Sequence, residues 1–473
     1  MITVVGIGRN KYDMTLKGVE AISHASKVVV KTALTPAFQY FEDNAIKCDI
    51  LDDIYDSAES FADLDKKIVK YFETALLSCD DICYCVTGSG YGDNSVKALS
   101  EKFEVRIIGG VGLEGSALEK FPSTDYTHLS GHYFSDKRVI SVNKRIPLVI
   151  TEIDNKNLAS NIKLWLSKLY GDEEKAAIFI GGEPKEIEIY ELDRLEGYAY
   201  DTSLIILPVE IQNRKGFDFS DLMEIMYRLR DKDGCSWDKA QTHESIRKNL
   251  VEEAYELVSA INEEDIENMI EETGDVLLQS VFHSVIGEQT GEYDVYEVLS
   301  GLCTKLLTRH THIFGEDKAT SPEEALGFWE KAKVKEKEYV STADKMERLP
   351  KEFPSLLYAE KVQKYAGKVG FDFESISDAI AKAKEELGEL ENATSDSEKE
   401  MEAGDLLFSI ANIVRLYGVS GEIALSRSNK KFVQRFSLME KLITKEGKDI
   451  KNLNAKELDA YYVKAKEILN EDR

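Results

Sequence analysis

Proline, cysteine and long apolar runs are scarce in this chain. Only 8 prolines and 6 cysteines occur among 473 residues, and no apolar run approaches the roughly 20 residues that a membrane helix requires. The cysteines form no CxxC pair, which favours reduced thiols in a cytosolic protein. The opening residues, MITVVGIGRN, lack the basic and apolar regions of a secretory signal. We therefore expect a cytoplasmic protein with no membrane partner.

Basic residues are also in deficit. The chain has 60 Lys and Arg against 87 Asp and Glu, a formal net charge of -27. Because nucleic acids attract basic surfaces, this balance argues against a nucleic-acid partner. It does not exclude small phosphate-bearing ligands, since a divalent cation can lie between an acidic pocket and a phosphate.

The length is too great for a single core, and the sequence patterns divide it into three domains. Strand-like and helix-like stretches alternate in residues 1–212, which predicts an α/β domain with a mostly parallel sheet. Helical periodicity then dominates, and two prolines interrupt it within residues 339–354. We expect two all-α helical-bundle domains there, at residues 221–338 and 353–469. The strand candidates in the first domain are Thr3–Ile7, Val28–Val30, Ile82–Val86, Val105–Ile108, Leu148–Thr151, Ala177–Ile180 and Ser203–Pro208.

Acidic residues recur at matched spacings in the two helical segments. The first set is Glu253, Glu256, Glu272 and Asp275, and the second is Glu386, Glu389, Glu402 and Asp405. The leading pairs are 133 residues apart (386 minus 253) and the following pairs 130 (402 minus 272). Such a repeat indicates a duplicated domain.

Each set predicts a metal site. Residues at i and i+3 share a helix face, and a turn near Asn262–Asp265 would fold the second helix back along the first. Four carboxylates would then converge and repel one another, which a hard cation such as Mg²⁺ relieves. A single acidic pair would usually mark a solvated helix face in so acidic a chain. The paired spacing, the glycine before each aspartate and the recurrence favour metal binding instead.

Both helical segments resemble the MazG family of nucleoside triphosphate pyrophosphohydrolases. The stretch GCSWDKAQTHESIRKNLVEEAYE is similar to the opening pattern of that family, although Ser236 replaces its usual proline. The resemblance implies that both quartets bind Mg²⁺ and that a nucleoside triphosphate is cleaved to a monophosphate and pyrophosphate. It implies substrate-binding residues Trp237, Lys305, Arg309, Trp329 and Lys333 in the first copy, and Lys382, Lys431, Arg435, Tyr462 and Lys466 in the second. Glu252 or Glu385, next to the ligands, is the expected general base.

The first domain resembles the tetrapyrrole (precorrin and uroporphyrinogen) methylases. The similar stretches are VVGIG, TLKGVEAI, CVTGSGYGD and IIGGVGLEGSALE, and their order before the helical repeats is typical of the YabN type of methylase–MazG fusion. This implies an S-adenosylmethionine site between two lobes, formed by Gly6, Gly8, Gly88, Ser89, Gly90, Gly110 and Val111. Arg9 stands where the family usually has proline, so methyl transfer and its acceptor stay open.

Three functions therefore remain open. The chain could be a pyrophosphohydrolase with an attached methylase-like domain, a tetrapyrrole-type methyltransferase with nucleotide-sensing repeats, or a non-catalytic regulator. The two complete quartets favour the first. Apolar positions such as Leu277, Leu278, Val281 and Phe282 require partner helices. The MazG family meets this need by dimerising, so we expect a homodimer through the helical domains, although pairing between the two copies stays possible.

Overall fold

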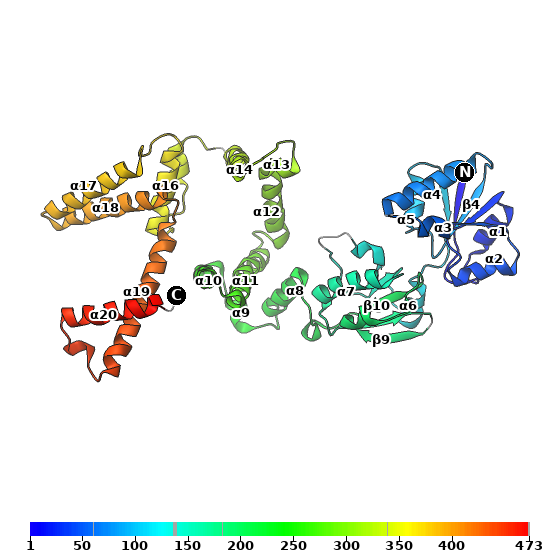
Figure 1. The fold of residues 1–473 in the computed structure, drawn as a ribbon, viewed down its shortest axis with the longest axis horizontal. Helices are drawn as coiled ribbons and strands as arrows, with labels where there is room; N and C mark the ends of the chain where they lie inside the picture. Colours follow the sequence, from blue (N-terminus) through cyan, green and yellow to red (C-terminus); the bar gives the residue numbers. More distant parts are fainter. Residues whose placement is uncertain (60, 136–139, 182, 338, 472–473) are drawn as a thin grey trace. The chain divides into compact units, whose positions relative to one another are not determined.

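A computed structural model describes residues 1–59, 61–135, 140–181, 183–337 and 339–471 (Figure 1). The chain divides into two compact units, Met1–Val295 and Tyr296–Arg473. Each unit is described by itself. Within the described residues, no single helix is long and apolar enough to cross a membrane, and the helices Asp396–Leu416 and Gly421–Lys445 meet that test only as a pair bent by 102°.

The first lobe of unit 1 is a five-stranded parallel sheet in the order β3-β2-β4-β1-β5. Its strands are β1 (Ile2–Gly6), β2 (Lys27–Val30), β3 (Asp49–Ile50), β4 (Ile82–Val86) and β5 (Val105–Ile108). In the register, Val4 lies opposite Tyr84 on one side and Ile107 on the other. Every residue of β1 and β4 is buried, as expected of a parallel sheet that helices cover on both faces.

Helices cover the two faces of this sheet. They are α1 (Leu16–His24), α2 (Gln39–Asp43), α3 (Asp52–Asp56), α4 (Phe61–Leu76) and α5 (Asn94–Ser100), with a short 3-10 turn η1 (Pro36–Phe38). Helix α6 (Gly115–Lys120) instead packs on the sheet of the second lobe through Ala117. Phe72 of α4 and Leu99 of α5 pack with Tyr84 on one face. Ile22 of α1 and Phe41 of α2 pack on the other. The turns that follow these strands therefore lie at the ends of the sheet and not on its faces.

The second lobe has a mixed sheet in the order β6-β7-β10-β8-β9. Its strands are β6 (Thr127–Ser130), β7 (Leu148–Thr151), β8 (Lys175–Phe179), β9 (Pro184–Glu188) and β10 (Ser203–Ile206). Only β6 and β7 are parallel, so the expectation of a mostly parallel sheet is right for the first lobe and wrong for the second. Helix α7 (Lys156–Tyr170) buries Leu158, Ile162 and Leu166 in the core of this lobe. The 3-10 turns are η2 (Gly131–Phe134), η3 (Ile189–Arg194) and η4 (Ile211–Asn213).

Four helices complete unit 1. They are α8 (Phe219–Arg230), α9 (Ser236–Ala240), α10 (His243–Glu263) and α11 (Ile266–Thr290). Met226 of α8, Ile246 of α10 and Val285 of α11 share one core. Glu264 ends α10 in a left-handed conformation (φ +56°) and Asp265 caps α11, which confirms the turn predicted between these helices.

Unit 2 is helical throughout the residues that the structure describes. Its helices are α12 (Val295–Arg309), α13 (Thr311–Phe314), α14 (Pro322–Lys337), α15 (Thr342–Glu347), α16 (Ser355–Gly367), α17 (Ile376–Asn392), α18 (Asp396–Leu416), α19 (Gly421–Lys445) and α20 (Ala455–Glu471), with a 3-10 turn η5 (Ile450–Asn452). Helices α17 and α18 lie side by side (Figure 1). Ser395 and Glu398 form a capping box that begins α18. The predicted limits of the two helical domains stay predictions.

A buried group of charges joins α8 to the second lobe. Lys144 Nζ lies 2.6 Å from Asp221 Oδ2 and 3.2 Å from Asp218 Oδ2, and it donates to the Leu169 carbonyl at 3.1 Å. The guanidinium of Arg214 pairs with the other oxygen of Asp221, whose side chain has no exposed surface. Asp218 and Asp221 also form the capping box of α8. The start of this helix is therefore fixed to the α/β part by ion pairs that are buried at Asp221 and partly exposed at Asp218.

Replacing Asp221 should destabilise unit 1 strongly. Asp221→Ala would leave two buried cations short of their partner, a change that typically costs about 3–5 kcal/mol. The control is Glu224→Ala, which breaks ion pairs with the exposed side chains of Arg145 and Arg228 and should cost about 1 kcal/mol or less. Thermal unfolding followed by circular dichroism compares the two midpoints, and equal shifts would contradict the prediction.

Candidate functional site

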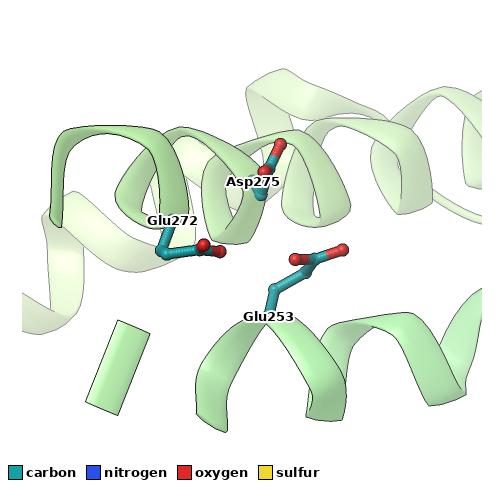
Figure 2. A group of neighbouring side chains, drawn as sticks. All are labelled: Glu253, Glu272 and Asp275. Carbon is teal, nitrogen blue, oxygen red and sulfur yellow. The ribbon is translucent and has the colours of Figure 1, made fainter. Parts of the chain in front are cut away.

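The first group of carboxylates lies between α10 and α11. Glu253 projects from α10, whereas Glu272 and Asp275 project from one face of α11 (Figure 2). One oxygen of each side chain lies within 4.8 Å of the other two. Glu256, the fourth member of the predicted quartet, lies outside this group of three but is close enough to influence the pKa values of Glu253 and Glu272.

Burial and mutual repulsion disfavour the charged form of these acids. Burial is the largest cause of the raised pKa of Glu253, followed by the charges of Asp275, Glu256 and Glu272. The pKa of Glu272 is raised by burial and then by Glu256 and Asp275. An acid with a raised pKa destabilises the fold when it is ionised, and protonation relieves this as the pH falls through that pKa. A bound divalent cation would relieve it at neutral pH.

The oxygen atoms of this group are suitable ligands for a hard cation. Glu272 Oε2 and Asn249 Oδ1 are buried and have no hydrogen-bond partner among the described residues. Asn249 lies one helical turn before Glu253 on α10, so the two share a face. Unpaired buried oxygens require an explanation, and Mg²⁺ prefers ligand sets made of oxygen alone. The residues present therefore fit the cation that the sequence implies, and Asn249 is a further candidate ligand that the sequence did not indicate.

The second group lies between α17 and α18. Glu386 and Glu389 come from α17 and Glu402 from α18, again with one oxygen each within 4.8 Å of the others. Asp405, the fourth predicted ligand, is exposed on α18 and lies outside the group. Burial is the first cause of the raised pKa of Glu389, followed by the charges of Glu386 and Glu402.

Lys382 forms ion pairs with acidic residues in and beside this second group. Lys382 Nζ lies 2.7 Å from Glu386 Oε1 and 2.9 Å from Glu385 Oε1. Glu386 is only 5% exposed, whereas the Lys382 side chain is 37% exposed, so the ion pair is shielded from water on the carboxylate side alone. These hydrogen bonds raise the pKa of Lys382, and its charge opposes the rise in the pKa of Glu389. Of the two predicted general bases, Glu385 is therefore held by a cation, whereas Glu252 is exposed beside Glu253.

The predicted substrate residues of the second copy lie on α19 and α20. Lys431 and Arg435 are on α19, and Tyr462 and Lys466 are on α20. The Tyr462 ring is 5.8 Å from the ring of Phe432, the neighbour of Lys431. Among the described residues, Lys431, Arg435 and Lys466 form no ion pair, so their charges are available to an anion.

The corresponding residues of the first copy are engaged with one another. Arg309 donates to both carboxylate oxygens of Glu336, at 2.8 and 3.0 Å, and is 5% exposed. The ring of Trp329 lies 5.2 Å from the Arg309 guanidinium and 5.1 Å from Lys333 Nζ. This pairing between residues 27 positions apart was not visible in the sequence. The remaining predicted residues of this copy, Lys305 on α12 and Trp237 on α9, are exposed.

The predicted cofactor residues lie on three turns that follow β1, β4 and β5. They are Gly6, Gly8, Gly88, Ser89, Gly90, Gly110 and Val111. Gly8 and Gly88, both with φ +72°, exchange backbone hydrogen bonds of 3.1 and 3.0 Å. A Cβ atom on Gly110 would lie 2.2 Å from the carbonyl oxygen of Gly6. Close contact between backbones therefore accounts for these glycines, and their cofactor role stays a prediction.

A cavity of about 1080 Å³ in unit 1 is lined by residues of both lobes. On its wall, the buried Lys31 Nζ lies 2.7 Å from Asp93 Oδ2 and donates to Tyr200 Oη at 2.9 Å. Tyr200 in turn donates to Glu152 Oε1 at 2.6 Å. Burial alone would lower the pKa of Lys31, but Asp93 and the other anionic groups around it raise it. Sequence reasoning missed this network, although a lysine directly after the apolar strand KVVV was a signal.

Comparison with known proteins identifies the helical part. The MazG nucleotide pyrophosphohydrolase domain family matches residues 241–314. The chain is 33% identical to "Uncharacterized protein YabN" of Bacillus subtilis, over 98% of each protein. It is 43% identical to the nucleoside triphosphate pyrophosphohydrolase/pyrophosphatase MazG of Thermotoga maritima, over 53% of this chain and 96% of that protein. Among solved structures, the precorrin-6Y methylase of Archaeoglobus fulgidus matches with a TM-score of 0.33 and 14% identity, over 44% of this chain and 99% of that one.

The carboxylate-bearing helix pairs and these relatives define a MazG-type chain. More particularly, the chain belongs to the YabN-type members of the MazG family, as its full-length relative in Bacillus subtilis establishes. The predicted resemblance to the YabN-type fusion is thereby confirmed, whereas the duplication of the MazG domain stays a prediction, because the family model matches the first helical segment. The predicted fold class, an α/β part followed by all-α helices, is confirmed as well.

Proposed function

We propose that this chain is a Mg²⁺-dependent nucleoside triphosphate pyrophosphohydrolase, which converts a nucleoside triphosphate and water to a monophosphate and pyrophosphate. The observation that carries the proposal is the convergence of three carboxylates within 4.8 Å on each of two helix pairs. Family membership supports it, and relatives in Thermotoga maritima and Escherichia coli are named as enzymes of this activity.

The roles of the side chains follow from their chemistry. Glu253, Glu256, Glu272 and Asp275 would hold the cation in the first copy, and Glu386, Glu389, Glu402 and Asp405 in the second. When bound, the cation neutralises charge on the triphosphate and on the departing pyrophosphate. Glu252 or Glu385 would accept a proton from the water that attacks phosphorus.

The cationic residues favour the second copy as the hydrolytic one. Lys431, Arg435 and Lys466 would bind phosphate oxygens, because none of them forms an ion pair with another described residue. Tyr462, beside Phe432, would stack on the base. In the first copy, by contrast, Arg309 could bind phosphate only after releasing Glu336.

Glutamine substitution at the first carboxylate of each group tests the activity. Incubation of the wild type with a panel of nucleoside triphosphates and Mg²⁺ should release pyrophosphate, and Glu386→Gln should remove most of that release. Combining it with Glu253→Gln should lower the rate by about 100-fold or more, since each isosteric change removes a charged ligand. Glu391→Gln, an exposed glutamate of α17 outside the group, is the matched control. A double variant that works at the full rate would overturn the proposal.

We also propose that the α/β part binds S-adenosylmethionine, with an acceptor still to be found. The glycine turns lie at the carboxyl ends of three parallel strands, which is where open α/β sheets bind their ligands. The cofactor would supply a reactive methyl group. The cavity that bears Lys31 and Tyr200 is large enough for a small-molecule acceptor, which favours methyl transfer as the second candidate function.

Calorimetric titration of the full chain tests this second candidate. S-adenosylmethionine should bind saturably with one site per chain, and S-adenosylhomocysteine should compete with it. EDTA in both solutions keeps the carboxylate groups free of metal, so that binding through the adenosine moiety at the nucleotide sites is suppressed. Absence of binding heat for both compounds at several temperatures would contradict cofactor binding.

Exposed apolar side chains on the carboxylate-bearing helices support a homodimer. Val281 and Phe282 are buried against α8, but Leu277 is 44% exposed and Leu407, on α18, is 61% exposed. Exposed apolar side chains on a helix can bind the apolar face of a partner helix. We therefore propose that the helical domains pair between two chains in the cytoplasm.

The mass of the protein in solution tests the dimer. Each chain has a mass of 53.3 kDa, so sedimentation equilibrium should give about twice that value at micromolar concentration. Leu407→Glu should shift the equilibrium toward the single chain, because it places a charge on the apolar surface. A wild-type mass of one chain throughout the concentration range would contradict pairing.

A further inference from the structure

The two carboxylate groups differ at one position that precedes each of them by a single helical turn. That position is Asn249 on α10 and Lys382 on α17, and the offset of 133 residues (382 minus 249) equals that between Glu253 and Glu386. Residues at i and i+4 share a helix face, so each of these side chains lies on the same face as the first carboxylate of its group. The duplicated sites thus carry a neutral amide in one case and a permanent cation in the other.

In the second group, the ammonium group of Lys382 is already paired with one of the expected metal ligands, Glu386. Lys382 Nζ is 2.7 Å from Glu386 Oε1, and Glu386 is 5% exposed. Burial of the carboxylate strengthens its attraction to the ammonium group, although the Lys382 side chain itself is 37% exposed. A divalent cation that enters this group must therefore compete with an ammonium group for the same carboxylate.

In the first group, the carboxylates have no basic partner among the described residues that would compete with a metal ion. Among the residues that the structure describes, no lysine or arginine pairs with Glu253, Glu272 or Asp275. Asn249 Oδ1 and Glu272 Oε2 are instead buried and unpaired. An amide oxygen is an acceptor that a hard cation uses readily, whereas a lysine offers donors only.

Resting on the function proposed above, we propose that the two groups bind divalent cations unequally and that the residue at this position sets the difference. The α10–α11 group binds the cation tightly in the absence of nucleotide, with Asn249 as an additional oxygen ligand. The α17–α18 group binds it weakly on its own, because Lys382 supplies part of the neutralising charge. The cation then reaches that group together with the triphosphate, whose phosphates offer Lys382 a new partner.

Titration of the full chain with Mn²⁺ in the absence of nucleotide tests this inference. Free Mn²⁺ is counted by electron paramagnetic resonance, and added Mg²⁺ shows whether the same sites accept it. We expect two classes of site that differ at least 10-fold in affinity. Glu253→Gln should remove the tight class and Glu386→Gln the weak class, which assigns each class to its helix pair.

Exchange of the two residues provides matched variants. Asn249→Lys should weaken the tight class at least 10-fold, and Lys382→Asn should strengthen the weak class by a similar factor. Lys382→Asn both removes the competing ammonium group and adds an oxygen ligand. Lys382→Met removes the ammonium group without adding an oxygen, so it shows how much of the effect comes from the lost competition alone. Unchanged thermal unfolding midpoints would show that these variants are folded.

The possible failures can be told apart. Two sites of equal affinity that the exchanges leave unchanged would overturn the inference, and so would loss of the tight class in Glu386→Gln. Either result leaves the pyrophosphohydrolase proposal intact if the glutamine variants still abolish pyrophosphate release. If the wild type binds no Mn²⁺ at either group, the metal-dependent function proposed above fails as well.

Discussion

Repulsion among converging carboxylates is the constraint on which the helical part of this protein depends. Helices α10 and α11 bring Glu253, Glu272 and Asp275 within 4.8 Å of one another, and burial adds to the unfavourable ionisation of Glu253 and Glu272. A fold that only needed stability would place such charges apart in water. Their convergence, repeated on α17 and α18, is a cost that makes physical sense when a cation and a phosphate-bearing ligand complete the site.

The two groups of carboxylates meet the same constraint in different ways. Lys382 places a positive charge directly on Glu386, whereas Asn249 leaves the first group to an external cation. The phosphate-binding side differs in parallel, because Arg309 is paired with Glu336 while Lys431 and Arg435 remain available. These contrasts agree with the proposals made above, in which the second group receives a polyanion and the first retains a metal.

The sequence predicted elements that have a strong local signal, and it failed where partners are distant. All seven predicted strands exist, because each is a short run of residues with high strand propensity. Three strands were missed: β3 has only two residues, β6 (THLS) has a single strongly apolar residue, and β9 (PKEIE) carries charges suited to a sheet edge. The carboxylate spacings predicted three members of each group. The partners of Lys31 could not be predicted, since Asp93 and Tyr200 are 62 and 169 residues away.

The junction between the α/β part and the helices is held by buried contacts of α8. A flexible linker would need no buried contacts, yet Lys144 and Arg214 hold Asp221 where it has no exposed surface. Because Met226 of the same helix belongs to the core that contains Val285 of α11, α8 is shared by two packed structures. A displacement of α8 would therefore disturb both the second lobe and the helix that carries Glu272. Within unit 1, these contacts therefore fix α8 and α11 relative to the second lobe.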